Sequence, residues 1–528
     1  MEEFLNILIF IIFTLIYFLS LNGYGKLLLN TIFSKNFYFN PFEITIFGLI
    51  FNIIVGYLLY FTFGFNSYLN LFFLLTGVAF FYFLFNKKDI IYIYKSSFFI
   101  LLFFSLLIIS KTHEDFPSYH LEGVRDIFEN KLTLGTANIK LKFSHASLFS
   151  YIQSLTVIPY FFFKFFHVSI FILYFCLLGY LYYQSKTYRL NKLENFFCNF
   201  LLIILIIKFT RLSEYGYDYV SQFLLLIVFH KVLFYKKYII EIYKSLLIFA
   251  LAVLIKPVAI LFFPIFLLLF YKNNIKVLFL KINKKFLIIF FLLQIIFISN
   301  SFTRTGCLFY PLTFTCFSKG TIAWSAKEDL KIYSNTVQLW AKGYYHQDKS
   351  KYVEKLSEQK FKDDFNWFKY WIDIHFFYKI SEFLIILALT LVVFFITIVR
   401  GVNFGSFFNQ SKEIYISFFL SFFSILLWLN FIPDFRFGFA PILIFVFCFF
   451  SFFLKKDFFI LENRIKFFLC IAILFFNIKN FHRIYKEINR DDHFQFKNFP
   501  WFSQYSRDVD SSKFRIVDYG YYRVAYKL

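Results

Sequence analysis

The sequence predicts an all-α protein that crosses a membrane many times, and three observations support this fold class. Of the 528 residues, 59% are hydrophobic and 16% are charged, with a mean hydropathy of +0.64, which is far from the balance of a soluble domain. Apolar stretches recur along the chain at about the 20-residue length that a helix needs to cross a bilayer, for example at 4–21 and 438–454. Charged residues lie mostly between these stretches, as expected for a bundle of spanning helices.

The apolar segments can be placed in order. The segment 245–271 is too long for one unbroken helix and contains Pro257 and Pro264, so we expect it to fold back as a tight hairpin. Counting it twice predicts about 14 transmembrane helices. The semi-polar stretch 145–163 predicts a half-inserted or interfacial helix. The expected spans are 4–22, 42–63, 68–86, 95–110, 167–183, 194–208, 219–235, 245–271, 286–300, 377–399, 414–432, 437–454 and 466–478.

The basic residues predict the orientation of these spans. A net charge of +23 is compatible with nucleic-acid binding, but Lys and Arg occupy short connectors and form no continuous basic face. Short connectors rich in Lys and Arg face the cytoplasm, and the span order puts all of these on one side: 87–95, 186–192, 236–244 with Lys244, 272–285 and 455–466. The polar segments then lie together outside: 111–144, 209–218, 301–376, 432–437 and 479–528.

This topology divides the chain into four regions. They are an N-terminal membrane region, 1–300, with the first outer loop at 111–144; a large outer loop, 301–376; the C-terminal helices, 377–478; and an outer tail, 479–528. The large loop contains four tryptophans and should form a small ordered subdomain. Near-alternation of apolar and polar residues at 514–526 predicts a strand or hairpin. Cys307 and Cys316 could form a disulfide in this loop or remain two free thiols.

The first outer loop holds the main candidates for chemistry. It places Glu114 and Asp115 beside an imidazole at the end of a span, and Tyr119 and His120 follow. A carboxylate in such a position can act as a general base. The alternative interpretation is a hydrated loop that happens to be charged. The spacing of its acids and histidines matches no diagnostic metal site, so the sequence leaves a divalent metal undecided.

Three further places carry ionisable residues at membrane boundaries. Arg211 and Asp218 flank a short outer loop, and Asp434 and Arg436 form a turn between two spans. Lys256 lies inside an apolar segment, where a charged side chain usually faces a cavity or a partner. The alternatives are that Lys256 extends its ammonium group to the membrane surface and that the 434–436 turn is an ion-paired structural feature.

Five stretches in this order resemble a known superfamily. They are DFPSYHL (115–121), GTANIKLKFSHAS (135–147), SEYGYD (213–218), RTGCLFYP (304–311) and PDFRFG (433–438). Together they resemble the GT-C superfamily of multi-span glycosyltransferases, and more closely an uncharacterised bacterial group of large membrane proteins associated with surface polysaccharide genes. The chain departs from that pattern at Lys142, where the group has an arginine, so the bidentate fork of a guanidinium is absent.

The resemblance implies an inverting transferase of the bacterial cytoplasmic (inner) membrane. Such an enzyme moves a sugar from a polyprenyl-phosphate carrier to a glycan, lipid or protein acceptor at the outer face. Asp115 would be the catalytic carboxylate of the first loop, with Glu114 as the alternative. Substrate contacts would come from Tyr119, His120, Arg211, Asp218, Lys256, Arg304, Tyr310, Asp434 and Arg436.

Two other function classes stay open at this point. An O-antigen-type polymerase also combines many spans with large outer loops and a lipid-linked glycan. A transporter or flippase would have ionisable residues spread through its spans, whereas here they gather in the outer loops. The sequence does not indicate a cofactor.

Overall fold

The structure, a computed structural model, describes most of the chain. The described residues are 1–33, 40–109, 115–145, 147–187, 191–212, 216–234, 239–272, 283–352, 355–402, 410–490, 496, 498–504 and 511–527. They form an almost entirely helical protein, which confirms the all-α class.

Eight helices in the described residues are long and apolar enough to cross a membrane, or up to nine if the bent pair Trp367–Phe377 and Ser381–Thr397 is one span. These long helices identify a membrane protein. They are α1 (Glu2–Phe33), α2 (Pro41–Thr62), α3 (Ser67–Leu84), α4 with the short helices after it (Lys87–Leu106), Phe163–Thr187 with α9 (Val168–Thr187), α15 (Lys284–Thr305), α20 (Lys412–Phe431) and α22 (Glu462–Ile488).

The eight helices are fewer than the 14 or so spans that the sequence predicts. The difference arises because several apolar helices have only 16 or 17 residues: α10 (Lys192–Lys208), α11 (Asp218–Leu233), α12 (Ile239–Ile255), α19 (Ser381–Thr397) and α21 (Phe435–Ser451). A helix of this length rises about 25 Å, slightly less than the apolar thickness of a bilayer. The larger count therefore remains a prediction.

The predicted break in 245–271 is present. α12 ends at Ile255, and a 3₁₀-helix, η6 (Pro257–Phe266), continues into α13 (Leu267–Lys272). Lys256 contacts Asp218 at the start of α11, whereas Lys272 donates to the carbonyl of Val232 at the end of α11. The two segments therefore run in opposite directions, as expected for a hairpin that turns at Pro257.

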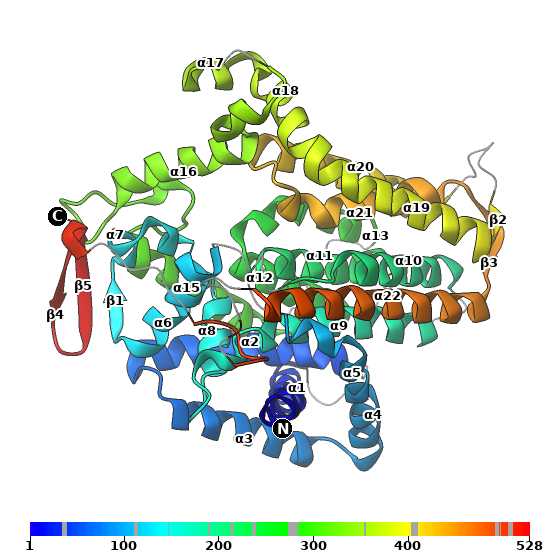
Figure 1. Cartoon of the computed structure of the whole chain (residues 1–528), viewed down its shortest axis with the longest axis horizontal. Coiled ribbons are helices and arrows are strands. Elements are labelled where there is room, and N and C mark those ends of the chain that lie inside the picture. Colours follow the sequence, from blue (N-terminus) through cyan, green and yellow to red (C-terminus); the bar gives the residue numbers. More distant parts are fainter. Residues whose placement is uncertain are drawn as a thin grey trace.

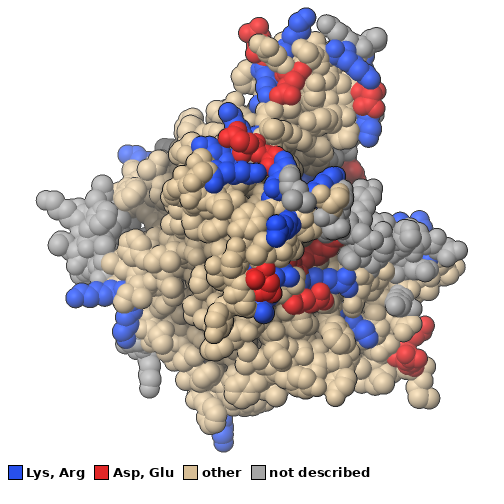
Figure 2. Space-filling view, turned by 90° about the vertical axis from the view of Figure 1, so that its left-hand side faces the viewer, with Lys and Arg blue, Asp and Glu red and all other residues tan. Residues whose placement is uncertain are grey.

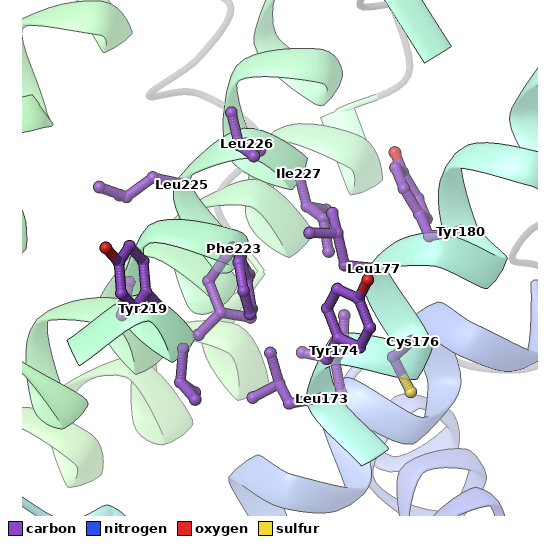
Figure 3. Close-up of a cluster of buried hydrophobic side chains, with 14 of the residues drawn as sticks. Leu173, Tyr174, Cys176, Leu177, Tyr180, Tyr219, Phe223, Leu225, Leu226 and Ile227 are labelled. Carbon is purple, nitrogen blue, oxygen red and sulfur yellow. The ribbon is translucent and has the colours of Figure 1, made fainter. Parts of the chain in front are cut away.

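The centre of the bundle is a continuous apolar core. In Figure 1, α9, α10, α11 and α22 lie with nearly parallel axes, horizontal in that view. Figure 3 shows side chains of α9, including Tyr174 and Leu177, packed against Phe223 and Ile227 of α11, and all four are buried. The Tyr174 hydroxyl donates to the Leu205 carbonyl of α10 at 3.1 Å, so the one polar group of this ring is satisfied.

Glycines let α1 approach its neighbours at backbone distance. A Cβ at Gly25 would lie 1.9 Å from the Ile44 carbonyl oxygen, and a Cβ at Gly48 would lie 2.1 Å from that of Leu21. Only glycine fits at such contacts, which are typical of helix crossings in membranes. A larger residue at either position would separate α1 from α2.

A buried ionic cluster joins α2, α11 and α12 at the other end of α11 from Asp218. Lys231 Nζ lies 2.8 Å from Glu43 Oε1 and 2.5 Å from Glu241 Oε2, and Lys244 Nζ lies 2.9 Å from Glu241 Oε1. We call this group the Lys231 cluster. It corrects the prediction for Lys244, which is buried in α12 and is not part of an exposed basic connector. The carboxylate partners of Lys244 explain why its ammonium group can be buried in α12.

The described parts of the polar segments predicted to lie outside are found toward the left and the top of Figure 1, with 514–527 at the left edge and 358–371 at the top. β1 (Leu132–Leu134) pairs in parallel with β5 (Tyr522–Lys527), which pairs antiparallel with β4 (Phe514–Asp518). The predicted hairpin of the tail is thus confirmed. A second small sheet, β2 (Val399–Val402) with β3 (Leu454–Ile460), lies at the opposite end.

The large loop is ordered, as predicted. Cys307 and Cys316 form a disulfide, which settles the open alternative. Trp367 and Trp371 are buried, and Trp371 Nε1 donates to the Pro433 carbonyl at 2.7 Å. The elements of this loop are η7 (Thr313–Thr315), α16 (Lys327–Lys342), η8 (Tyr344–Lys349), α17 (Glu358–Lys362), η9 (Asp363–Phe365), α18 (Trp367–Trp371) and the π-helix η10 (Ile372–Ile380).

The first outer loop is also built of short helices. They are the π-helix η2 (Phe116–His120), α6 (Leu121–Glu129), α7 (Thr136–Ile139) and η3 (Leu141–Ser144), and α8 (Phe149–Leu155) follows the loop. All seven residues of α8 are buried. The half-inserted or interfacial helix predicted at 145–163 is thus represented by a helix of only seven residues, whose polar side chains face other parts of the protein; its position relative to a membrane stays a prediction.

Candidate functional site

The first part of the site is an ion network around Asp218, the first residue of α11. Lys256 Nζ lies 2.6 Å from Asp218 Oδ1, and Arg436 Nη1 lies 3.1 Å from Oδ2. Arg436 Nε lies 3.1 Å from Asp434 Oδ1 as well. Both carboxylate side chains are 2% exposed, whereas those of Lys256 and Arg436 are 14% and 17% exposed. We call these four residues the Asp218 network.

The network has two positive and two negative side chains, so it is balanced. This balance explains how Lys256 can lie within an apolar segment. Of the two interpretations of Lys256, it favours an ionic partner and not extension of the ammonium group to the membrane surface. Lys256 also lies over the rings of Tyr217 and Phe437, at 5.5 Å from each centroid.

The turn between α20 and α21 positions Arg436. Asp434 Oδ1 accepts from the Arg436 backbone N–H at 3.0 Å as the N-cap of α21. Trp428 Nε1 donates to the Asp434 carbonyl at 2.8 Å. The turn is thus ion-paired, as the structural interpretation predicts. It also directs the Arg436 guanidinium toward Asp218 in another helix.

The second part of the site is Asp115, which precedes the π-helix η2. Lys142 Nζ lies 3.2 Å from Asp115 Oδ1 and 3.4 Å from Ser118 Oγ. It also lies 5.2 Å from the ring centroid of Tyr119. The Asp115 side chain is 25% exposed and that of Lys142 is 40% exposed, so this pair is open to solvent where the Asp218 network is closed.

Tyr119 and His145 lie within electrostatic reach of both parts. Burial raises the pKa of Tyr119 well above its usual value, and the charges of Asp218 and Asp115 act in the same direction. Burial lowers the pKa of His145 to about 3, helped by Lys256 and Lys142 and opposed by Asp218 and Asp115. His145 is therefore neutral at physiological pH. These shared effects place Asp115 and the Asp218 network in one site.

His120 packs against two aromatic rings of this site. Its ring lies 4.0 Å from that of Tyr119 and 4.8 Å, edge to face, from that of Tyr217. A Cβ at Gly216 would lie 2.2 Å from the His120 ring, and Gly216 has a φ of +56°. The glycine of the SEYGYD motif is thus required for the loop to pass His120.

Tyr310 lies at the site, whereas Arg304 takes no part in the ion pairs that form the site. The Tyr310 ring centroid lies 6.1 Å from that of His145, and burial raises the pKa of Tyr310 to about 12. Arg304 is buried in α15, where its Nε donates to Asn300 Oδ1 at 3.0 Å, and Tyr151 donates to the same oxygen at 2.8 Å. The observed contacts of Arg304 therefore support a role in packing the C-terminal end of α15.

The GTAN run has a structural role in holding the outer parts together. Gly135 has a φ of +73°, and its N–H donates to the Thr303 carbonyl at 2.7 Å. Asn138 Nδ2 donates to the carbonyls of Trp324 and Ala525, each at 2.9 Å. One asparagine thus connects the first outer loop, the large loop and the C-terminal strand.

The remaining candidates have different outcomes. Arg211 lies in the loop after α10, where its charge acts on Lys479 of α22. Glu114 lies outside the described residues, so its place relative to Asp115 is not defined. Within the described ranges, no three His, Cys, Asp or Glu side chains come together as metal ligands would.

Sequence reasoning missed several residues of the site. His145 and Lys142 lie in the quoted GTANIKLKFSHAS stretch but were not identified as site residues. Tyr333 lies 3.1 Å from His145 Nε2 through its hydroxyl, and the Trp340 ring lies 5.6 Å from the Arg436 guanidinium carbon. Both residues come from α16, and nothing in the local pattern of that amphipathic helix distinguishes them.

Comparison with known proteins identifies a family. Residues 7–444 match the model of a family described as a domain of unknown function, DUF8201. The chain belongs to this family. No curated protein and no solved structure matches it.

The DUF8201 match covers Asp115, the Asp218 network and the large outer loop. It ends within α21, so α22 and the β4–β5 hairpin lie beyond it. All the predicted site residues thus belong to the DUF8201 domain, while α22 packs against it from outside the matched range.

Proposed function

We propose that this protein is a membrane glycosyltransferase that moves a sugar from a polyprenyl-phosphate carrier to a hydroxyl of a glycan, lipid or protein acceptor. The observation that carries this proposal is the site itself: a partly exposed carboxylate, Asp115, shares one end of an apolar helical bundle with a balanced network of buried charges. The ordered resemblance to the GT-C superfamily supports the same reaction class.

The arrangement suits a substrate with an apolar tail and a polar sugar. The helices offer apolar surface for the tail, and Figure 2, which views the end with the outer loops, shows charged side chains over the central and upper part of that face and few over the lower part. A site at the end of a bundle allows the sugar to stay in water while the carrier stays in lipid.

Asp115 would be the general base. In an inverting transfer its carboxylate accepts the proton of the acceptor hydroxyl, the acceptor oxygen forms a bond to the anomeric carbon, and the bond from that carbon to the phosphate oxygen breaks. The phosphate leaves with the electron pair. General-base catalysis of this kind contributes about 100- to 10,000-fold in rate. Lys142 Nζ, 3.2 Å from Asp115 Oδ1, would hold the carboxylate in position.

The partly exposed cations Lys256 and Arg436 would face the departing phosphate. Tyr119, with a raised pKa, would remain a hydroxyl donor at all physiological pH values. His145, neutral with a pKa of about 3, would orient substrate by hydrogen bonding and would not act as a cation. The Asp218 carboxylate would hold the two cations in position.

The location that we propose is the outer face of a bacterial cytoplasmic membrane, with about 14 spans. The Cys307–Cys316 disulfide supports an oxidising side for the large loop. Single cysteines placed near Lys284 and near Asp329 test this topology with a reagent that cannot cross the membrane. We expect labelling of intact cells near Asp329 only, and labelling near Lys284 would overturn the orientation.

The test of function compares three acid-to-amide variants of one loop at matched membrane expression. Asp115→Asn should lose about 100-fold or more of product glycan, and Glu129→Gln, an exposed acid of the same loop, should keep full activity. Glu114→Gln decides whether its neighbour takes the role instead. Normal product from Asp115→Asn removes this residue from the mechanism.

The glycans that accumulate on deletion of the gene distinguish the reaction classes. Truncated lipid-linked units support the transferase. Complete units that are not polymerised would instead identify an O-antigen-type polymerase, and unchanged lipid-linked glycans would reject both.

A further inference from the structure

A histidine and a tyrosine from two separate outer segments meet at the candidate site. His145 follows η3 in the first outer loop, and Tyr333 lies in α16 of the large loop. The Tyr333 hydroxyl oxygen lies 3.1 Å from His145 Nε2, and the two ring centroids are 5.4 Å apart. One ring nitrogen of His145 is thus bonded to the protein.

The other ring nitrogen of His145, Nδ1, has no hydrogen-bond partner among the described residues and is not fully buried. The charges of Lys256, Asp218, Lys142 and Asp115 all act on this ring, so it lies within reach of both parts of the site. Nδ1 is therefore the nitrogen of His145 that is available to a substrate.

The position of the ring proton decides what Nδ1 can do. Burial lowers the pKa of His145 to about 3, so the ring carries a single proton at neutral pH. A neutral imidazole has one N–H group, which donates, and one bare nitrogen, which accepts. With the proton on Nε2, the bare Nδ1 would be a second candidate for the general base beside Asp115. With the proton on Nδ1, the ring can only donate to the substrate.

The hydroxyl of Tyr333 favours the proton on Nδ1. Burial raises the pKa of Tyr333, and Tyr310 and Asp115 act in the same direction, so the phenol keeps its proton. Within the described ranges, His145 Nε2 is the one hydrogen-bond partner of this hydroxyl. An O–H group withdrawn from water costs free energy when it donates to nothing. Donation to a bare Nε2 removes that cost and leaves the ring proton on Nδ1.

Tyr333 is held in place by the disulfide region of the large loop. Tyr333 packs against a small apolar cluster that contains Leu330, one turn earlier in α16, together with Tyr310 and the disulfide pair Cys307 and Cys316. The packing of the large loop thus brings the hydroxyl to a histidine of the first loop.

We propose that Tyr333 is a positioning residue that donates to His145 Nε2 and so holds the ring proton on Nδ1, from where it donates to a phosphate oxygen of the carrier. The identity of this ligand rests on the proposed function. Lys256, which we expect to face the phosphate, acts on the same ring. A neutral N–H donor adds a hydrogen bond to the phosphate without adding charge to the balanced Asp218 network. Asp115 then has no competing base in His145.

The test of the tautomer is a 15N NMR measurement on the full chain in lipid bilayers, with 15N-labelled histidine. The chain has nine histidines, and the signals that are missing in His145→Gln identify His145. We expect N–H splitting at Nδ1 in the wild type and signals of both tautomers in Tyr333→Phe, which lacks only the hydroxyl. The control Tyr345→Phe changes an exposed tyrosine of the same loop and should give the wild-type spectrum. A proton on Nε2 in the wild type, or unchanged His145 signals in Tyr333→Phe, would overturn the assignment.

Two lipid probes test the ligand in the same samples. Geranylgeranyl monophosphate should shift the Nδ1 signal of the wild type. Geranylgeraniol, which has the same tail but no phosphate, should leave the signal unchanged. A shift with both probes, or with neither, would overturn the phosphate contact.

Two substitutions of His145 distinguish a donor from a base. An asparagine amide places an N–H group near the position of Nδ1, whereas the glutamine amide reaches the position of Nε2. At matched membrane expression, His145→Gln should lower transfer about tenfold, the loss of one hydrogen bond, and His145→Asn should keep most of the activity. Equal losses in the two variants would overturn the donor role.

The NMR measurements separate this proposal from the proposed function, because they require no sugar transfer. A proton on Nδ1 and a phosphate-dependent shift in a protein without transfer would reject the enzyme but keep the assignment. Transfer that depends on Asp115, with the His145 proton on Nε2, would reject the assignment but keep the enzyme.

Discussion

Asp218→Asn tests whether the Asp218 network is the central ionic contact of the bundle. The substitution keeps the shape of the side chain and removes its charge. Lys256 and Arg436, at 2.6 Å and 3.1 Å from the two carboxylate oxygens, would then share the single negative charge of Asp434. The network would change from balanced to a net positive charge at a buried position.

The magnitude follows from burial. Removing one partner of a buried ion pair costs about 3–5 kcal/mol. Because the Lys256 and Arg436 side chains are 14% and 17% exposed, water can solvate part of the freed charge, and we expect the lower end of that range, about 3 kcal/mol. This corresponds to roughly a 100-fold rise in the unfolding equilibrium constant.

The assay is equilibrium unfolding in mixed micelles with increasing SDS, followed by circular dichroism. The control is Asp329→Asn, which removes the carboxylate of the more exposed pair with Lys527 at 2.5 Å and should cost no more than about 1 kcal/mol. The double variant Asp218→Asn with Lys256→Met removes a charge of each sign, so it should be more stable than Asp218→Asn alone. A loss in Asp218→Asn no larger than in the control would refute the reasoning.

Three other changes test separate features. Cys307→Ser opens the loop closed by the disulfide and should cost about 2–4 kcal/mol in unfolding experiments, with no further loss on adding reductant. Below pH 6.5 His145 is protonated in the unfolded chain but stays neutral in the folded chain, where its pKa is about 3. The free energy of unfolding should therefore decrease as the pH is lowered from 6.5 toward 3, by up to about 1.4 kcal/mol per pH unit. His145→Gln should remove this part of the pH dependence. Lys231→Met leaves Glu43 and Glu241 with one lysine between them and should cost about 3 kcal/mol, whereas Lys284→Met on the exposed end of α15 should cost little.

The sequence predicts the helices well because the signal is local. A run of apolar residues identifies a spanning helix without reference to its neighbours, and the proline at 257 identified the hairpin turn. The count of spans is less secure, because helices such as α11 are only 16 residues long. The alternation in the tail likewise predicted β4 and β5, but not their partner β1, which lies almost 400 residues earlier.

Residues of the site could be predicted from the sequence where the free-energy cost of burying a charged side chain indicates a functional role. Lys256 is such a residue, since an apolar setting requires a partner, and Asp218 is that partner. The same argument applied to Lys231, within the predicted span 219–235, would have indicated a buried ionic cluster, whereas Lys244 was assigned to a basic connector. Tyr333 and Trp340 could not be predicted, because only tertiary packing of α16 brings them to the site.

The pairing of β1 with β5 determines when the outer sheet can form. Arg523 on β5 contacts Thr133 on β1 across 390 positions of the chain. At a synthesis rate of about 5–20 residues per second, β1 is synthesised roughly 20 to 80 s before β5. During that interval the edge of β1 has no strand partner, and such edges readily pair with other chains. A chaperone, or the rapid folding of the neighbouring loop, would have to cover this edge until translation is nearly finished.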